Sequence, residues 1–423
     1  MQVLIVGASG FIGGRLARAF QAAGHEVICA SRSSIDSKVC RRQLRLDYTR
    51  LPEPEALRQA LAGVDVVINA VGILRNHGTQ TFEALHDAGP RALFSACAAA
   101  GVRRVIQISA LGAEDQAIAE YHRSKYAADR HLMSLPVDWI VVRPSLVYGP
   151  GGTSARMFNQ LASLPVQPLP GGGHQRVQPI HVDELVEAIL KLAQTPEPQR
   201  RVMVAVGPWP LTLRDFLRDL RRSMGLGKAR TIRVPSFLVR WSAAAGDWLP
   251  GAMLNRETLG MLERGNVGDP HDLTQVLGHR PREVVDFVAS GEREALRKTA
   301  TLDWLLPLLR VGVAAMWIIA AIVSAGLYPR QHSLDLLMSI GLPAALAPIA
   351  LFGAIAIDFA FGVLTLLPRR RRWFWTAQIA VVLGYTAIIT WRLPQLWLEP
   401  FGPVAKNLPI LAALLLLRQS ERQ

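Results

Sequence analysis

Short hydrophobic runs alternate with amphipathic stretches along the first 290 residues of the chain. Runs rich in β-branched residues lie at Val3–Val6, Glu26–Ala30, Val64–Asn69, Val105–Ser109 and Trp139–Val142. Between the first two, Gly13–Ala23 has the apolar spacing of a helix. Strands that alternate with helices form a parallel sheet with helices on both faces, so we expect an α/β fold with a Rossmann-type, doubly wound parallel sheet.

This alternation weakens after about residue 150. Turn-rich segments such as Pro168–Gly173 and an arginine-rich helical stretch at Leu211–Met224 follow. We predict a Rossmann domain at 1–150 and, at 151–290, a small substrate-side lid interleaved with the Rossmann core. Residues 291–303 are charged and helix-compatible, so we interpret them as a linker to the rest of the chain.

Long apolar segments dominate residues 304–423. They lie at 304–327, 342–367, 373–391 and 402–417, and the first three are near or above the roughly 20 residues that span a bilayer. The fourth is the weakest, because Lys406 and Asn407 shorten its apolar run. A buried helix of a soluble core would explain one such segment, but several in succession favour an all-α four-helix transmembrane bundle.

Positive charges predict the orientation of these segments. They lie between the second and third segments, before the first and after the last: Arg369–Arg372, then Arg293, Arg297 and Lys298, then Arg418 and Arg422. Loops rich in arginine and lysine stay in the cytoplasm, so four crossings place both termini and the N-terminal domain there. We therefore expect a multi-pass protein of the inner, cytoplasmic membrane that contacts membrane lipid.

The overall composition agrees with two unlike halves. Hydrophobic residues make up 50% of the chain and charged residues 19%, which excludes a disordered chain and an all-membrane channel. The net charge is +14. Its arginine-rich stretches at 214–222 and 369–372 are better explained as a solvated helix face and a cytoplasmic loop than as a base-reading surface, so we expect no nucleic-acid partner.

Cysteine and histidine give no sign of a metal site. The chain has an odd number of cysteines without a CxxC pair: Cys29, Cys40 and Cys97. This argues against a disulfide framework and a thiolate metal site, and a reducing compartment is the simplest interpretation. The histidines at positions 77, 86, 122 and 131 have no spacing that would gather them around a metal ion.

A glycine-rich turn follows the first predicted strand and opens the first predicted helix. Its sequence is Gly7-Ala8-Ser9-Gly10-Phe11-Ile12-Gly13. Gly7 permits a tight turn, Gly10 lets the backbone approach a pyrophosphate, and Gly13 allows close helix packing. The free N–H groups and the dipole of a helix start favour the anion. An ordinary βα turn is the alternative, but this context predicts that Ser9, Phe11, Ile12 and the three glycines bind a dinucleotide.

The end of the second predicted strand bears on the choice of nucleotide. An NAD site usually has Asp or Glu there, which binds the ribose 2′-hydroxyl. Here the sequence is Ala30-Ser31-Arg32-Ser33, and Arg32 suits a 2′-phosphate. We therefore expect NADP. A solvated surface arginine is the alternative, so NAD stays open.

Three residues form a candidate catalytic set. Tyr121 and Lys125 lie four residues apart on a predicted helix, which puts them on one face, about 6 Å apart at Cβ. A nearby ammonium stabilises tyrosinate, so we expect a lowered pKa that suits Tyr121 as a general acid/base. Ser109 ends a predicted strand, where ligands bind in open α/β sheets, and its hydroxyl would hold a substrate oxygen. Taken alone, Ser109 would more often be a cap or turn residue.

Together these residues resemble the short-chain dehydrogenase/reductase superfamily in its extended or atypical form. The resemblance rests on the glycine turn, Asn69–Gly72, Ser109, Tyr121, Lys125 and Arg143–Pro150, and the last run with Pro179–Asp183 is similar to epimerase/dehydratase-type members. It implies that Lys125 also binds the nicotinamide ribose and that Tyr121 transfers a proton while hydride moves. It further implies a cofactor site that includes Asn69, Ala70, Gly72 and Pro144, with Asp47 near the adenine.

Two segments are similar to one branch of that superfamily. His86–Leu93 and Ser109–Ala113 resemble the nucleotide-binding accessory subunit of respiratory complex I and related quinone-biosynthesis proteins. This implies a respiratory or quinone-biosynthesis complex as a partner. Many active members have asparagine shortly before the position of Gly89, whereas this chain has His86, Asp87 and Ala88, so a proton path through asparagine is not implied. The branch includes members that bind nucleotide without turnover.

The membrane half resembles DoxX-like four-helix domains, which assigns residues 304–423 to such a domain. The closing segments Pro400–Pro403 and Lys406–Pro409 carry this likeness. Asp358 lies roughly ten residues inside its apolar segment, and Arg310 enters from the same side. A charge at that depth costs several kcal/mol unless it is paired, so we predict an Asp358–Arg310 pair with a structural role; a proton or quinone site is the alternative.

These features predict a membrane-anchored NAD(P)-dependent oxidoreductase. A soluble substrate gives no reason for membrane spans, so we expect a small lipid-soluble or membrane-associated substrate, with quinones among the options. The first alternative is a non-catalytic NADPH-binding module that stabilises or senses a respiratory or quinone-handling complex. The second is a nucleotide-sugar epimerase/dehydratase, which would retain NAD and leave Arg32 out of place.

Overall fold

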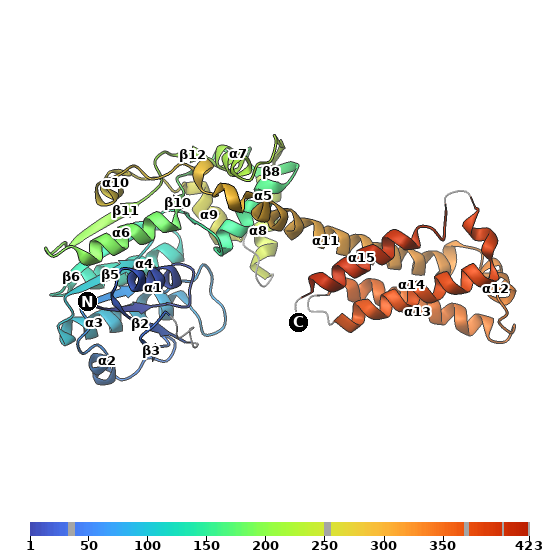
Figure 1. Ribbon diagram of the computed structural model, residues 1–423, viewed down its shortest axis with the longest axis horizontal. Helices are drawn as coiled ribbons and strands as arrows, with labels where there is room; N and C mark the ends of the chain where they lie inside the picture. The colour runs from blue at the N-terminus through green and yellow to red at the C-terminus, as the bar shows by residue number, and fades with distance from the viewer. Residues whose placement is uncertain (33–38, 249–254, 368–371, 400–401, 422–423) are drawn as a thin grey trace. The chain divides into compact units, whose positions relative to one another are not determined.

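The computed structural model describes residues 1–32, 39–248, 255–367, 372–399 and 402–421. The chain divides into two compact units, Met1–Ala300 and Thr301–Gln423 (Figure 1). This boundary lies within the segment 291–303 that the sequence marks as a linker.

A seven-stranded parallel sheet forms the centre of the first unit, as the sequence predicts. Its strand order is β11-β6-β5-β4-β1-β2-β3. The strands are β1 Gln2–Val6, β2 Glu26–Ser31, β3 Arg42–Arg45, β4 Val66–Asn69, β5 Arg104–Ile108, β6 Asp138–Pro144 and β11 Arg201–Ala205. The chain winds outward from β1 to β3 and then crosses to β4 on the other side of β1. Such a reversal opens a crevice at the carboxyl ends of β1 and β4, where ligands bind in this fold.

Two layers of helices cover the sheet because successive strand residues point to opposite faces. Val3 and Ile5 pack with one helical layer, whereas Leu4 and Val6 pack with the other. The first layer contains α1 Gly13–Ala22, α6 Val182–Gln194 and α10 His271–Leu277. The second contains α2 Pro54–Ala60, α3 Gly89–Ala100 and α4 Glu120–Ser134, with the π-helical turn η1 Glu83–Ala88 leading into α3.

The segment predicted as a lid contributes both to the main sheet and to smaller elements. Its α6 and β11 complete the Rossmann layers, so lid and core are interleaved. The other elements are β7 Val147–Tyr148, α5 Thr153–Ser163, β8 Val166–Pro170, β9 Arg176–Val177, β10 Ile180–His181, β12 Leu211–Thr212, α7 Leu213–Ser223, β13 Arg230–Val234, α8 Ser236–Trp248, α9 Arg256–Arg264, η2 Val284–Asp286 and η3 Ser290–Glu292. Phe158 and Phe216 join α5 and α7 in a separate hydrophobic core.

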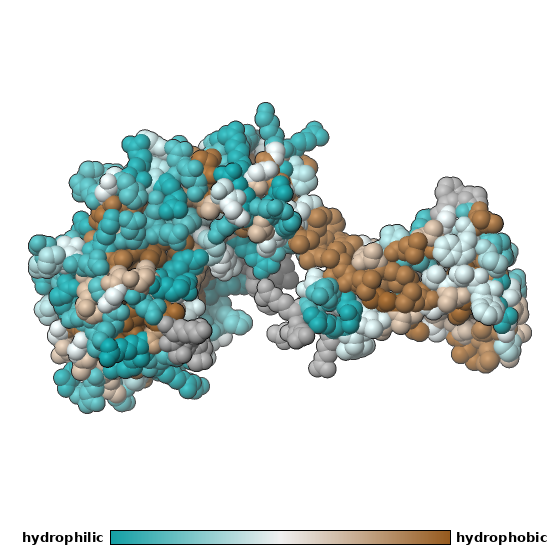
Figure 2. Space-filling model, viewed as in Figure 1, coloured by the Kyte–Doolittle hydropathy of each residue, from teal (hydrophilic) through white to brown (hydrophobic). Residues whose placement is uncertain are grey.

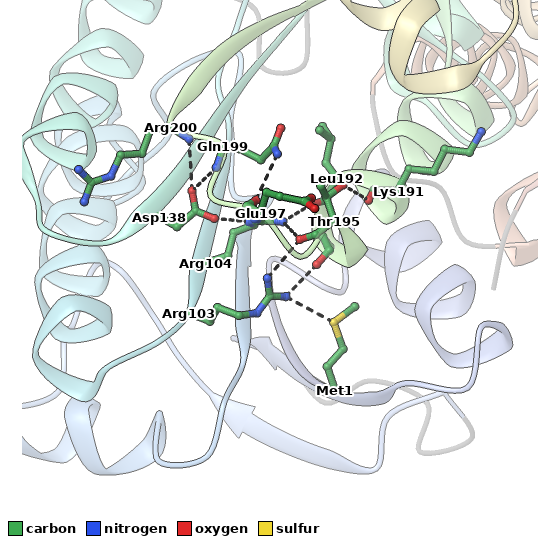
Figure 3. Close-up of polar contacts among 11 residues, drawn as sticks. Met1, Arg103, Arg104, Asp138, Lys191, Leu192, Thr195, Glu197, Gln199 and Arg200 are labelled. Carbon is green, nitrogen blue, oxygen red and sulfur yellow. Dashed lines mark hydrogen bonds and ion pairs between the residues drawn. The ribbon is translucent and has the colours of Figure 1, made fainter.

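A buried arginine ties the end of α6 to the start of the central strands. The Arg104 side chain is fully buried and donates to the carbonyls of Leu192, Thr195 and Glu197 at 2.5–2.7 Å (Figure 3). Its Nε also binds Asp138 at 2.5 Å. The last carbonyls of a helix have no partner within the helix, so the guanidinium satisfies them and neutralises the negative end of the dipole.

The cysteines require a correction. Cys29 on β2 and Cys40 before β3 form a disulfide, and Cys97 is a buried free thiol. An odd cysteine count without a CxxC pair does not show which residues the fold brings together. The register of β2 and β3 pairs Cys29 with Gln43, and the residues just before β3 bring the Cα of Cys40 within 5.7 Å of that of Cys29. The inference of a reducing compartment therefore loses its basis.

The second unit is helical, as predicted. Its elements are α11 Arg293–Ile322, which begins in the first unit, η4 Val323–Leu327, α12 Arg330–Ser339, α13 Ala347–Leu366, α14 Arg372–Arg392, η5 Pro394–Trp397 and α15 Asn407–Ser420. In the described part of the chain, three helical segments are long and apolar enough to cross a membrane: Ser290–Leu327, Ala347–Leu366 and Arg372–Arg392. With 14 residues, α15 measures only about 21 Å against a hydrocarbon core of about 30 Å.

Two of the sequence observations on topology lie outside the described residues. Of the run Arg369–Arg372, only Arg372 is described, and Arg422 is not.

The charged segment that was interpreted as a linker is helical from Arg293 onward, where α11 begins. Its residues therefore continue directly into the first candidate span.

Buried polar contacts and close helix packing hold the second unit together. Trp317 on α11 donates to Gln378 on α14 at 2.7 Å, and Gln378 donates to Thr365 on α13 at 3.3 Å. A Cβ on Gly362 would lie 2.4 Å from the Ile318 side chain, so this glycine lets α13 approach α11 closely. Figure 2 shows large hydrophobic areas on the visible surface of this unit, whereas the visible surface of the first unit is mostly hydrophilic.

The predicted Asp358–Arg310 pair does not form. Arg310 binds Glu421 at 2.5 Å and lies over the Trp375 ring. Asp358 is buried, and among the described residues its Oδ1 has no hydrogen-bond partner. The positions of Asp358 and Arg310 along their helices did not reveal that Glu421, which follows α15, is the partner of Arg310.

The glycines of α13 give a matched test of this packing. Gly362→Ala adds a methyl group against the Ile318 side chain and the Ala314 carbonyl, whereas nothing lies within 4 Å of the same methyl group at Gly353. We expect Gly362→Ala to lower the melting temperature of the second unit in detergent by about 3 °C or more, and Gly353→Ala to leave it unchanged or raise it slightly. Equal melting temperatures for the two variants would contradict the close approach of α11 and α13.

Candidate functional site

The glycine turn after β1 has the geometry that the sequence motif predicts. Gly7 has φ +82°, and a Cβ there would lie 3.0 Å from the Ala70 carbonyl. The N–H of Gly10 donates to the Gly7 carbonyl at 2.9 Å. A Cβ on Gly13 would lie 2.2 Å from that same carbonyl oxygen, so only glycine lets α1 start this close to the turn. The turn residues Gly7, Ser9 and Gly10 line a cleft and lead into α1, and the N-terminus of a helix favours the phosphates of a nucleotide.

A cleft runs from this turn across the carboxyl ends of β1, β2 and β4. Six of the predicted cofactor residues line it: Gly7, Ser9, Gly10, Arg32, Ala70 and Gly72. The other lining residues are Val6, Ser31, Leu46, Tyr48, Val71, Ile73, Gln80 and Leu85. A cleft that is lined by the glycine turn and by an exposed arginine fits a dinucleotide.

Asn69 positions the backbone of the neighbouring cleft residues. Its side chain is fully buried, accepts from the Tyr48 hydroxyl at 3.1 Å and donates to Gln107 at 2.7 Å. The same amide oxygen accepts from the N–H of Val71 at 3.4 Å. Asn69 therefore positions the backbone of residues 70–72 instead of lining the cleft.

Lys125 reaches the carboxyl edge of the sheet from α4. Its ammonium donates to the carbonyls of Val71 and Ile108 at 3.0 and 3.1 Å, just beyond β4 and at the end of β5. A Cβ on Gly72, which lines the cleft, would lie 3.3 Å from Nζ, so the buried ammonium lies directly behind this part of the cleft wall. Burial lowers the pKa of Lys125 to about 8, and the nearby Asp129 carboxylate opposes this shift.

Tyr121 lies one turn before Lys125, surrounded by aromatic rings. Its ring meets those of Phe82, His86 and His122 edge-on, with centroids 5.2–5.9 Å apart. Burial, together with the carboxylates of Glu257 and Asp129, raises the pKa of Tyr121 to about 12. The prediction of a lowered pKa is therefore wrong. The Lys125 ammonium is bound to two carbonyls, and the carboxylates near the phenol disfavour tyrosinate.

Ser109 has a different partner from the one expected. It is buried, and its hydroxyl donates to Asp129 at 2.6 Å. Asp129 lies one turn beyond Lys125 on α4 and also binds Arg143 at 3.4 Å. Burial raises the pKa of Asp129 to about 6. The Ser109 hydroxyl thus donates to a carboxylate in this structure, and its role in holding a substrate oxygen stays a prediction.

His86 lies on η1, three residues before Gly89. It is fully buried, accepts from the Ile73 N–H at 3.0 Å through Nε2, and its Nδ1 lies 3.1 Å from the Ser124 hydroxyl. Burial and the Lys125 charge lower the pKa of His86 to about 2, so this ring is neutral. It fixes the chain beyond Gly72 and packs against Tyr121.

Besides Gly13, Asn69 and Lys125, four predicted cofactor residues lie outside the cleft lining. Phe11 lies beneath the Arg15 guanidinium and against Gly152, and Ile12 packs with the first helical layer. Asp47 accepts from the N–H and hydroxyl of Thr49 at 2.9 and 2.8 Å. Pro144, at the end of β6, accepts from the N–H of Leu111 at 2.9 Å.

Other residues of the site were missed by the sequence analysis. Asp129 could have been found, because it continues the spacing of four that joins Tyr121 to Lys125. Glu257 on α9 accepts from the Tyr121 N–H at 2.9 Å. It has no such signal, because 136 residues separate the two positions.

The two halves of the chain match known families. Residues 3–207 match the NAD dependent epimerase/dehydratase family, and residues 314–415 match the DoxX-like family. The first segment is an epimerase/dehydratase domain of the extended short-chain dehydrogenase type. The second is a DoxX-like domain. The epimerase/dehydratase family is NAD-dependent, so the first unit is an oxidoreductase domain with a nicotinamide cofactor.

Curated relatives of the epimerase/dehydratase domain include reductases and respiratory subunits. A ceramide reductase of Caulobacter vibrioides is 28% identical over 55% of this chain and 73% of its own. A 2-alkyl-3-oxoalkanoate reductase of Stenotrophomonas maltophilia is 25% identical over 53% and 76%. The mitochondrial NADH dehydrogenase [ubiquinone] 1 alpha subcomplex subunit 9 of Arabidopsis thaliana is 26% identical over 58% and 63%. The match thus spans less than two thirds of that respiratory subunit.

Solved structures share the fold of the epimerase/dehydratase domain. A nucleoside-diphosphate-sugar epimerase of Staphylococcus aureus is 17% identical, with a TM-score of 0.56 over 68% of this chain and 99% of that chain. The UDP-glucuronic acid 4-epimerase of Bacillus cereus is 17% identical, with a TM-score of 0.51 over 72% and 100%. At this identity the likeness concerns the fold alone.

The two pKa values at the site predict a pH dependence for this domain. Lys125, with its pKa near 8, loses its charge as the pH rises through 8, whereas Tyr121, with its pKa near 12, keeps its proton. We therefore expect kcat/KM for reduction to be level from about pH 6 to 7.5 and to fall about tenfold per pH unit above 8. Lys191→Met, on the exposed surface of α6, keeps this profile. An alkaline limit above about pH 10 would assign it to Tyr121 instead.

Proposed function

We propose that this protein is a membrane-anchored, NADPH-dependent reductase that acts on a carbonyl group of a lipid-soluble substrate. One observation carries the proposal: Lys125 binds the strand-end carbonyls of Val71 and Ile108 beside the cleft, and Tyr121 lies one turn before it on α4. This combines a cationic anchor, a phenol and a dinucleotide cleft at one sheet edge.

Each group has a chemical task in this reaction. The bound nicotinamide cofactor supplies hydride to the carbonyl carbon. Gly7, Gly10 and the first N–H groups of α1 bind the pyrophosphate, and Lys125 holds the nicotinamide ribose. Tyr121 donates its proton to the substrate oxygen as that oxygen gains negative charge. A phenol with a pKa near 12 is protonated at neutral pH, which is the state that a proton donor needs.

The DoxX-like domain and the relatives support a lipid substrate. Three apolar helices hold the protein at a membrane, where a lipid-soluble substrate is concentrated. The names of two relatives denote reductases of a ceramide and of an alkyl-substituted oxoalkanoate, both of which carry acyl chains. We therefore favour an oxo group on an acyl lipid. A quinone is the second substrate class, and a sugar nucleotide fits the membrane anchor least.

A non-catalytic role is the second candidate function. Similarity to the complex I accessory subunits of several eukaryotes supports an NADPH-binding module that associates with a respiratory or quinone-handling complex. In that case Lys125 and the cleft would hold the nucleotide, and Tyr121 would have only a packing role.

We also propose the location of the protein. The first unit and both termini lie in the cytoplasm, and the spans lie in the inner membrane. The arginines around the candidate spans support this orientation through the positive-inside rule. An even number of crossings requires that α15, although short, crosses together with the residues before it. A reporter that is active only in the cytoplasm is therefore expected to be active when it is fused after Gln423.

Removal of the phenol hydroxyl separates the two candidate functions. We expect Tyr121→Phe to lower turnover of an oxo-acyl lipid at least about 100-fold, because general-acid catalysis is lost. Its NADPH affinity is expected to stay within about twofold, since Lys125 and the glycine turn are unchanged. Tyr126→Phe is the matched control. Tyr126 lies on the same helix as Tyr121, and its ring lies beneath the Arg143 guanidinium. If wild type binds NADPH but oxidises it with no oxo-lipid, quinone or aldehyde, the binding-module function replaces the reductase.

The rim arginine predicts the choice between the two nucleotides. Arg32 is exposed at the end of β2 and lines the cleft, so its guanidinium is placed to bind a 2′-phosphate. We expect Arg32→Gln to weaken NADPH binding about tenfold, or about 1.4 kcal/mol, and to leave NADH binding unchanged. Arg18→Gln, on the exposed face of α1, is the control. Equal losses for NADPH and NADH, measured by titration of nucleotide fluorescence, would identify Arg32 as an ordinary surface residue.

A further inference from the structure

Helix α8 carries a row of aromatic side chains that no other part of the described structure covers. Phe237, Trp241 and Trp248 are 70%, 77% and 89% exposed. At 3.6 residues per turn, these three lie within about 40° of one another on the helix. Val239, Ala243 and Gly246 lie on the opposite side and are buried. Helix α8 is therefore amphipathic, with its larger hydrophobic side chains turned outward.

Basic residues flank this aromatic row. The segment 228–248, which comprises β13, α8 and the residues before and between them, contains four cations and one anion: Lys228, Arg230, Arg233, Arg240 and Asp247. The three arginines are exposed, and Ile232 between two of them is 56% exposed. Tryptophan and phenylalanine beside arginine are the side chains that favour the interface between lipid headgroups and acyl chains.

The chain itself brings this surface to a membrane. Candidate spans follow the first unit in sequence, so α8 is tethered to a bilayer and the effective concentration of lipid near it is high. The positive charge complements anionic headgroups, which attract basic segments by about 1 kcal/mol for each Lys or Arg near the surface. A membrane is therefore complementary to both the aromatic and the basic side chains of this surface.

Helix α8 is connected to the candidate active site through α9. Val239 and Ala243 of α8 pack on Leu259 of α9, so the two helices lie side by side (Figure 1). From α9, Glu257 accepts the N–H of Tyr121 at 2.9 Å. The Arg75 side chain, near the cleft residue Ile73, donates to the Asp247 carbonyl at 3.3 Å. Helix α9 therefore contacts Tyr121 directly, and α8 packs on α9 with its aromatic row exposed.

We propose that the aromatic and basic face of α8 is a membrane-docking surface, which lies in the headgroup region of an anionic bilayer beside the entrance to the Tyr121 site. Phe237, Trp241 and Trp248 reach into the acyl region, and the arginines bind lipid phosphates. Docking holds the soluble unit on the bilayer surface. Passage of a lipid substrate from the bilayer to Tyr121 rests on the proposed function, whereas the docking itself does not.

An environment-sensitive fluorophore at a single engineered cysteine tests the docking. The label is attached at Ala244→Cys, on the side of α8 between Trp241 and Trp248, in the full chain. The control label is attached at Glu53→Cys, an exposed position before α2. Both proteins are placed in nanodiscs of phosphatidylcholine and phosphatidylglycerol, with and without a nitroxide on the lipid acyl chain. Wild type treated with the same reagent gives the background from native cysteines.

The two labels are expected to respond differently. We expect the lipid nitroxide to quench the Ala244→Cys label at least about fivefold more than the Glu53→Cys label, because an interfacial helix lies about 5–10 Å into the bilayer surface. Replacing phosphatidylglycerol with phosphatidylcholine is expected to reduce the quenching. A label at Ala244→Cys that stays as accessible to aqueous iodide as the control would overturn the proposal and assign the surface to a protein partner.

A triple variant tests whether docking serves the reaction. Phe237→Ser, Trp241→Ser and Trp248→Ser together remove the aromatic row without touching the buried face of α8. We expect the KM for a bilayer-borne carbonyl lipid to rise about tenfold, while kcat/KM for a short, water-soluble carbonyl compound stays unchanged. Quenching in a protein that reduces no substrate would keep the docking surface and reject the reductase. An unchanged KM for the lipid would reject the role of docking in substrate entry.

Discussion

The ammonium of Lys125, bound between two strand-end carbonyls, joins the sheet to the candidate active site. Its contacts with Val71 and Ile108 at 3.0 and 3.1 Å set the position of α4 against the carboxyl edge of the sheet. Because α4 is a regular helix, the same contacts place Tyr121 one turn before and Asp129 one turn after this anchor. Burial of the ammonium also explains why its pKa lies near 8.

Electrostatics then divide the roles among the neighbours of Lys125. Burial and two carboxylates keep Tyr121 protonated, which makes the phenol a proton donor. Asp129 accepts a hydrogen bond from the Ser109 hydroxyl and forms an ion pair with Arg143, so these two groups hold α4 in place. His86 stays neutral and fixes the chain after β4. Lys125 thus lies behind the cleft residues Val71 and Gly72, and Tyr121 lies one turn before it on α4.

Local sequence patterns predicted the elements of this protein better than the contacts between them. Strand alternation and the glycine turn depend on neighbouring residues, so the sheet and the cleft followed from the sequence. Side-chain partners depend on the tertiary fold: Glu257 reaches Tyr121 across 136 positions, and Glu421 reaches Arg310 across 111. The disulfide between Cys29 and Cys40 likewise depends on how the chain enters β3 beside β2. No periodicity or spacing encodes such partners.

Transfer of a labelled hydride tests the central claim most directly. The full chain in nanodiscs that contain an oxo-acyl lipid would be supplied with NADPH deuterated at C4 of the nicotinamide, with each stereoisomer in turn. The account predicts that one stereoisomer, and only one, transfers deuterium to the carbon of the lipid that becomes a carbinol, as mass spectrometry of the extracted lipid would show. Nucleotide that stays bound while neither isomer labels an oxo-lipid or a quinone would contradict the account.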